Sequence, residues 1–141
     1  MSIWFKKLDV AELNRRGENT MSEFLGIEFT KVGNDFLTAT MPVSPKTRQP
    51  LGILHGGANV VLAETIASTA ANAVIDLNAF YCVGLEINAN HIRSVKEGIV
   101  TAVTTPIHLG RTTQVWEIKI TNQDGKLSCI SRMTAAVIAR A

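Results

Sequence analysis

The 141-residue chain lacks the marks of several common protein classes. Its two cysteines, Cys82 and Cys129, have no C-x-x-C spacing and no neighbouring histidine cluster, so we expect buried structural thiols and no metal site. The N-terminus has no long apolar stretch before a small-residue cleavage site, which argues against a signal peptide. Polar residues interrupt the longest apolar stretch, 58–75, so a membrane span is not expected. These absences favour a cytoplasmic protein.

Charge is also sparse. Charged residues make up 18% of the chain, the net charge is +2, and the basic residues are scattered along the sequence. With no basic block and no nucleic-acid-reading motif, a nucleic-acid partner is not expected. A lean charged surface is compatible with burial against a second copy, which is a weak indication of oligomerisation.

The remaining sequence consists of well-separated periodic segments. Short helices are predicted at 9–17 and 20–25, each with a capping residue at its start and a glycine at its end. A long helix, apolar on nearly all sides, is predicted at 58–76. Alternating segments predict strands at 27–32, 36–43, 81–94, 98–109, 112–121 and 127–139. Pro106 inside one of these segments requires either an edge strand or a bulge.

These segments predict an α+β fold in which a curved antiparallel sheet encloses one central helix. Consecutive strands joined by short turns form antiparallel sheets. The long apolar helix must bury most of its surface, and a sheet wrapped around it covers more of that surface than a flat sheet would. No repeat or linker divides the chain. We therefore expect one domain over residues 1–141, with residues 1–25 as an N-terminal helical arm.

Glu64 is the candidate catalytic residue, because it lies in the middle of the most apolar helix. A buried carboxylate is unfavourable unless it is hydrogen-bonded or has a chemical role, and a structural Glu paired with a buried donor is the common case. Ser68 lies four residues further on the same helix face. Its hydroxyl could orient the carboxylate or a water, and close packing of a small residue is the equal alternative.

His55, Gly56 and Gly57 precede the same helix. Backbone N–H groups at a helix start are unpaired, the helix dipole favours negative charge there, and glycines let a ligand approach the backbone. An oxyanion hole needs these features, although an ordinary loop-to-helix turn has the same pattern. Gln49, in the loop 44–57, could donate to a carbonyl oxygen or simply be solvated.

The spacing of these groups constrains the assembly. Gly56 and Glu64 are eight residues apart, or about 12 Å along a helix. One small reacting group cannot contact both residues of a single chain. If both act on one bond, they come from two subunits whose helices run antiparallel across a two-fold axis. The candidate chemistry thus predicts a homodimer.

The run 49–68, QPLGILHGGANVVLAETIAS, resembles the hotdog-fold acyl-CoA thioesterases. It is most similar to the branch of the Arthrobacter-type 4-hydroxybenzoyl-CoA thioesterases and the menaquinone-pathway 1,4-dihydroxy-2-naphthoyl-CoA thioesterases. The phenylacetate-type branch tends to have Asp where this chain has Glu64. The similarity extends over nearly the whole chain. The resemblance implies a hotdog fold and hydrolysis of an aromatic acyl-CoA ester, with no cofactor.

The resemblance also implies a role for each residue of the motif. Glu64 would be the nucleophile or the general base, and the N–H of Gly56 would polarise the thioester carbonyl. Gln49 and His55 would help to bind or orient that carbonyl, and Ser68 would position the water or the carboxylate. In such enzymes the site lies between the subunits of a homodimer, and relatives often form homotetramers as dimers of dimers.

Four further residues are candidates for binding the substrate. Gly57 belongs to the motif at the helix start. His91 and Arg93 are two apart in a predicted strand and so face one side. In relatives, matching positions hold the CoA nucleotide or line the dimer interface, and a solvated strand end is the alternative. Arg111 is a further candidate for contact with a phosphate.

Two other functions are open at this point. A hotdog-fold hydratase or dehydratase usually has a His and an acid in a short H-x-x-x-x-D-like loop motif, whereas glycines and apolar residues follow His55 here. A non-catalytic acyl-CoA-binding protein of the same fold would gain nothing from burying the Glu64 carboxylate. The substrate itself could also be an acyl-carrier-protein thioester.

Overall fold

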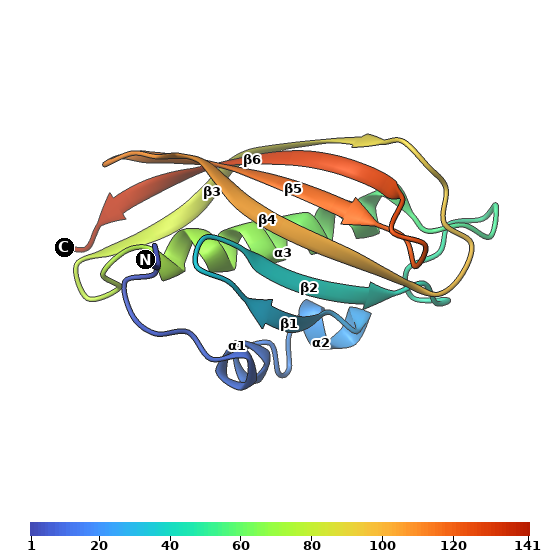
Figure 1. Cartoon of the computed structure of the whole chain (residues 1–141), viewed down its shortest axis with the longest axis horizontal. Coiled ribbons are helices and arrows are strands. Elements are labelled where there is room, and N and C mark those ends of the chain that lie inside the picture. The colour runs from blue at the N-terminus through green and yellow to red at the C-terminus, as the bar shows by residue number, and fades with distance from the viewer.

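The computed structural model describes residues 1–141, and Figure 1 shows one curved sheet wrapped around one long helix. The six strands pair antiparallel in the order β1-β2-β4-β5-β6-β3. They span Glu28–Val32 (β1), Leu37–Pro42 (β2), Phe80–His91 (β3), Ile99–Leu109 (β4), Thr113–Thr121 (β5) and Leu127–Ala139 (β6). The helices span Val10–Arg16 (α1), Met21–Leu25 (α2) and Gly56–Ala73 (α3). The predicted α+β architecture and its order of elements are confirmed.

Local side chains define the two short helices of the arm. Asp9 caps α1 by accepting from the N–H of Ala11, and Thr20 caps α2 by accepting from the N–H of Ser22. Gly26 ends α2 in the left-handed conformation, with φ at 76°. A residue with a Cβ rarely adopts that conformation, so the glycine determines where the chain leaves the helix.

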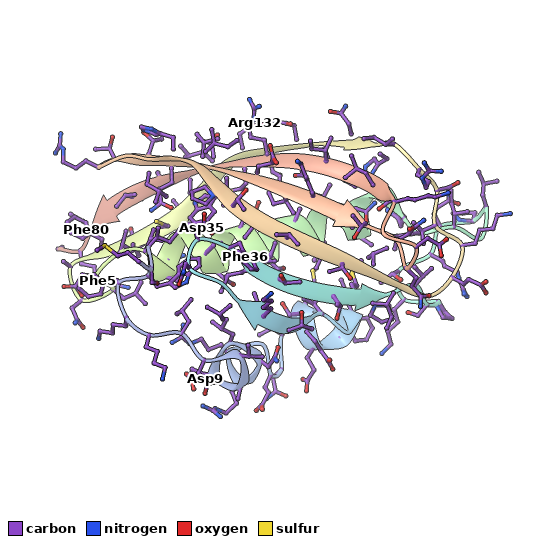
Figure 2. All side chains as sticks on the ribbon, in the orientation of Figure 1. Phe5, Asp9, Asp35, Phe36, Phe80 and Arg132 are labelled. Carbon is purple, nitrogen blue, oxygen red and sulfur yellow. The ribbon has the colours of Figure 1, made fainter.

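The two edges of the sheet differ. At the β1 edge, Asn14 of α1 accepts from the N–H of Phe29 at 2.8 Å and donates to its carbonyl at 3.0 Å, so the arm covers this edge. The β3 edge has no neighbouring strand. Apolar side chains of β3 are exposed, namely Phe80 (39%, labelled in Figure 2), Val83 (40%) and Leu85 (61%). An uncovered apolar edge can pair with another chain.

Helix α3 is buried on one face. Its buried residues, which pack against the sheet, are Ala58, Asn59, Leu62, Ala63, Ile66, Ala67, Ala70 and Ala71. The opposite face carries Glu64, Thr65 and Ser68 and is only half-buried. The sheet therefore covers less of the helix than expected, because a single curved sheet reaches only the face of α3 that packs against it. None of the helices combines the length and apolarity needed to cross a membrane.

Two bulges interrupt the regular strand pairing. In β4 the register with β5 shifts between Pro106 and His108, and β2 pairs with β4 only as far as Thr104, so the proline lies at a bulge on a stretch of β4 that has no neighbour on the β2 side. In β3 the register shifts between Gly84 and Glu86. Bulges redirect side chains and are common beside functional sites. The bulge at Gly84 lies beside the Glu64 carboxylate of α3.

Candidate active site

The first turn of α3 leaves one backbone donor free. His55 caps the helix, its Nδ1 accepting from the N–H of Gly57 at 2.8 Å. The carbonyl of the same residue accepts from the N–H groups of Ala58 and Asn59. No acceptor in the surrounding loop or cap engages the N–H of Gly56. Because a free N–H at a helix start favours an oxyanion or a carbonyl oxygen, Gly56 is the available donor of this motif.

A cavity of about 300 Å³ opens beside this turn. Gln49, His91 and Arg93 line it together with Gly56. The amide oxygen of Gln49 accepts from the N–H of Leu51, which leaves the amide nitrogen of Gln49 as a donor. Donors from three separate segments of the chain therefore converge on one cavity.

Glu64 lies on the half-buried face of α3, beside β3. Its Oε1 accepts a hydrogen bond from the Ser68 hydroxyl at 3.0 Å, and no ion pair of the chain includes it. A Cβ built on Gly84 would lie 2.5 Å from this oxygen. Glycine at this position thus lets the strand backbone approach the carboxylate. The remaining lone pairs of the carboxylate are free to interact with a substrate or a water.

Asn72 holds β3 against the helix near this carboxylate. Its oxygen accepts from the N–H of Cys82 at 2.9 Å. Its amide donates to the carbonyls of Ser68 and Cys82, at 3.0 Å and 3.4 Å. Burial raises the pKa of the Cys82 thiol above its usual value of 9.0, so the thiol stays protonated at neutral pH. Glu64, and not Cys82, is therefore the candidate reactive group here.

The two groups of residues are separate within one chain. The cavity beside Gly56 does not include Glu64 or Ser68 in its lining. A second cavity, of about 390 Å³, lies between the N-terminal arm and α3 and reaches Ser68. One chain therefore brings Gln49 and Gly56 together, and Glu64 and Ser68 together, without joining the two pairs.

Three candidate residues are placed differently from what the sequence suggested. The N–H of Gly57 is already bonded to His55. Arg93 was expected inside a strand, but β3 ends at His91 and Arg93 reaches the cavity from the following loop. Arg111 lies in the turn between β4 and β5, at the end of the sheet opposite the loop that precedes α3 (Figure 1). Within one chain, Arg111 is thus at the other end of the sheet from Gly56 and the cavity beside it.

Sequence reasoning missed two residues, Gly84 and Asn59. A glycine inside an alternating strand indicates a bulge or a close backbone approach, and both are found at Gly84. Asn59 is only 5% exposed, and a buried amide normally has hydrogen-bond partners. Gly84 interrupts the alternation of a strand, and Asn59 interrupts the apolar run of a helix. Neither pattern identifies the residue that Gly84 or Asn59 contacts.

A sheet that curves around α3, together with a half-buried acid on that helix, is the architecture of the hotdog-fold thioesterases. The family model described as the thioesterase superfamily matches residues 51–129, which is more than half of the chain. The chain therefore belongs to the thioesterase superfamily and is a thioester hydrolase. The matched range includes Gly56, Glu64 and His91.

Relatives resemble the chain over nearly its whole length. A putative esterase of Pseudomonas aeruginosa is 51% identical over 138 residues, which cover 98% of this chain and 95% of that protein. A 1,4-dihydroxy-2-naphthoyl-CoA hydrolase of Escherichia coli is 50% identical over 136 residues, 96% of this chain and 99% of that protein. A crystal structure of a glutamine-to-alanine variant of a Pseudomonas aeruginosa thioesterase superposes with a TM-score of 0.97 at 49% identity, covering 99% and 100% of the chains. These matches favour the thioesterase prediction over the hydratase and binding-protein alternatives.

Proposed function

We propose that the protein hydrolyses an aromatic acyl-CoA ester in a site that two subunits share. One subunit supplies the N–H of Gly56 and the other supplies the carboxylate of Glu64. One observation carries this proposal: a free donor and a largely free carboxylate lie on the same helix, eight residues and about 12 Å apart. Neither group can complete a thioester site with the other in one chain.

The reaction needs polarisation and one carboxylate. The thioester carbonyl oxygen accepts from the N–H of Gly56, and the amide nitrogen of Gln49 is placed to donate as well. Glu64 either attacks the carbonyl carbon or takes a proton from an attacking water. The C–S bond breaks, the CoA thiolate leaves and is protonated, and water completes the carboxylic acid. Ser68, which donates to Glu64 at 3.0 Å, holds the carboxylate in place.

The uncovered edge of β3 is the proposed dimer contact. Gly84, beside the Glu64 carboxylate, lies on this edge strand, and its neighbours Val83 and Leu85 are exposed. Pairing of two β3 edges about a two-fold axis would run the two α3 helices antiparallel and bring a partner's first turn toward each Glu64. We further propose that two such dimers assemble into a homotetramer.

The cavity between the arm and α3 is the proposed acyl-binding pocket. Only three of its twelve lining residues are apolar, Leu13, Ile27 and Phe29. Thr65, Thr69 and Asn72 are among its polar residues, so the pocket suits a hydroxylated aromatic acid better than a plain aliphatic chain. The named Escherichia coli relative acts on 1,4-dihydroxy-2-naphthoyl-CoA, and we propose the same substrate and a cytoplasmic role in menaquinone biosynthesis. The arm, residues 1–25, would then belong functionally to the single domain 1–141.

The CoA portion of the substrate would follow the cavity beside Gly56. His91 and Arg93 line this cavity and can donate to phosphate or amide oxygens. Arg111 lies at the other end of the sheet, so it would contact the same CoA only from the partner subunit. Gly57 contributes by giving the substrate room near the helix start, since its N–H is engaged by His55.

A thiol-release assay with purified protein tests the function directly. The substrates are 1,4-dihydroxy-2-naphthoyl-CoA, benzoyl-CoA, aliphatic acyl-CoA esters and an acyl-carrier-protein thioester. We expect the largest kcat/KM for a hydroxylated aromatic CoA ester. An enoyl-CoA is assayed in parallel, and loss of its absorbance without thiol release would instead indicate a hydratase. Tight binding of CoA esters without turnover would indicate a binding protein.

A further inference from the structure

Asn59 is a polar residue of α3 to which the proposed mechanism gives no role. It is 5% exposed, and its amide oxygen is a buried atom without a hydrogen-bond partner. Its amide nitrogen lies 3.3 Å from Nδ1 of His91, a residue at the end of β3. A buried polar atom without a partner is unfavourable, so the contact that the Asn59 amide nitrogen makes with His91 has to offset this cost.

The geometry of this contact indicates which tautomer the neutral His91 ring adopts. If the Asn59 amide nitrogen donates, Nδ1 must carry a lone pair, and the proton of the neutral ring is on Nε2. If the Asn59 amide were turned over, its NH2 group would take the place of the buried oxygen, where no acceptor is within reach. A buried carbonyl oxygen without a partner is tolerated more readily than a buried N–H. The first orientation is therefore favoured.

The Nε2 atom of His91 lies at the start of α3. A Cβ built on Gly56 would be 2.7 Å from Nε2, so the ring lies against the first residue of the helix. The same cavity is lined by Gly56, His91 and Gln49. Nε2 thus provides a neutral N–H donor beside the free N–H of Gly56.

We propose that Asn59 is a positioning residue that holds His91 as its Nε2–H tautomer, so that this N–H donates to an acceptor oxygen of the bound CoA ester next to Gly56. The identity of the ligand rests on the proposed function. The tautomer does not, since it follows from contacts within the chain.

Nitrogen-15 NMR of histidine-labelled protein measures the tautomer without any substrate. In the wild type we expect a bare Nδ1 and a protonated Nε2 for His91. Asn59→Leu removes the donor and should give a mixture of tautomers. Asn59→Asp can accept but cannot donate, so it should move the proton to Nδ1, and it serves as a second variant if the leucine protein is unstable. A wild-type His91 protonated at Nδ1, or an unchanged ring state in Asn59→Leu, overturns the proposal.

Kinetics test whether Asn59 acts through His91. Asn59→Leu should raise KM for the CoA ester about three- to tenfold, the effect of one hydrogen bond, with little change in kcat. In the His91→Ala background the same substitution should add nothing. In the His91→Gln background, the glutamine amide nitrogen replaces the Nε2–H donor of histidine. A glutamine has no tautomer for Asn59 to select, so the effect of Asn59→Leu on KM should be small in this background. An undiminished effect in the His91→Ala background would overturn the proposal. A wild type that hydrolyses no thioester would refute the proposed function and leave the NMR result standing.

Discussion

The first and third turns of helix α3 carry opposite halves of the proposed chemistry. The first turn has no acidic residue, and it has a free N–H at Gly56 beside an open cavity. The third turn has the Glu64 carboxylate, held by Ser68 and placed against Gly84 of the edge strand. In the proposed mechanism, one chain thus carries two half-sites, and a second copy joins them.

In the proposed site, the separation along the helix also keeps the N–H of Gly56 and the carboxylate of Glu64 from bonding to each other. An acidic side chain in the first turn would accept hydrogen bonds from the free N–H groups, as capping residues do. Such a hydrogen bond would occupy the N–H that the thioester carbonyl needs. His55 caps the helix through Gly57 and leaves Gly56 free, while Glu64 is too far along the helix to compete.

Removing the acid should have the largest effect. In Glu64→Gln the side chain keeps its size and loses its charge, so we expect kcat to fall by about 10²–10⁴-fold while the assembly is unchanged. Steady-state kinetics and size-exclusion chromatography measure the two properties. Glu28→Gln, which changes an exposed carboxylate on β1, at the other edge of the sheet, is the matched control. A Glu64→Gln enzyme within tenfold of the wild type would break the comparison between the two turns.

Separating the subunits should remove activity almost as completely. Leu85→Asp places a charge on the uncovered β3 edge, where it should prevent pairing and lower kcat by roughly 10²-fold through loss of the partner's donor. Light scattering gives the mass of the particle. Ile99→Asp, at an exposed apolar position of β4, is the control and should remain dimeric. A fully active Leu85→Asp monomer would show that one chain holds a complete site.

Crowding the third turn should have an intermediate effect. In Gly84→Ala the new Cβ would meet Glu64 Oε1 at 2.5 Å, so the carboxylate must move. A displacement of this kind should lower kcat by about 10–10²-fold, with a smaller change in KM. In the Glu64→Gln background the same substitution should have no further effect on kcat. An equal loss in both backgrounds would mean that Gly84 acts on something other than the carboxylate.

Mixed dimers test directly whether the two turns complement each other. Gly56→Ala forces the first turn against His91, whose Nε2 would be 2.7 Å from the new Cβ. Coexpression with Glu64→Gln should give dimers in which one of the two sites combines both intact groups. Random pairing predicts about a quarter of the wild-type activity, although each variant alone is inactive. A coexpressed sample as inactive as its parents would contradict the shared site.

The smallest effect concerns two thiols, the half-buried Cys82 near the third turn and the buried Cys129, which lies opposite His91 in the pairing of β3 with β6. Burial raises the pKa of both thiols above 9.0. Stability from the protonated thiols is complete below the unfolded pKa and decreases as pH rises past it, with a slope up to about 1.4 kcal/mol per pH unit for each thiol. Urea unfolding from pH 7 to 10 should show this loss. Cys82→Ser and Cys129→Ser should each reduce the slope.

Much of the fold and part of the site follow from local sequence. The periodicity of 58–76 predicted α3, and the spacing of Glu64 and Ser68 placed both on one helix face, where the structure has their 3.0 Å hydrogen bond. Strand alternation and turn residues predicted antiparallel pairing of consecutive strands, which holds for β1–β2, β4–β5 and β5–β6, whereas β3 pairs with β6 and not with β4. These features depend on residues within a few positions of one another, which the sequence displays directly.

Other features depend on contacts between distant segments. The sequence could not show that β3 would place Gly84 against Glu64, or that Asn59 would contact His91, 32 positions further along the chain. It also could not show that the turn between β4 and β5, which carries Arg111, would lie at the opposite end of the sheet from the loop that precedes α3 (Figure 1).

The sequence by itself determined the helices, the strands and the position of an acid eight residues after a glycine-rich helix start, because these are properties of short-range periodicity. Only the tertiary structure decided which N–H stays free, which strand edge stays open and which face of α3 the sheet leaves uncovered. Those outcomes depend on how strands from both ends of the chain pack around the helix, and local propensity does not encode that packing.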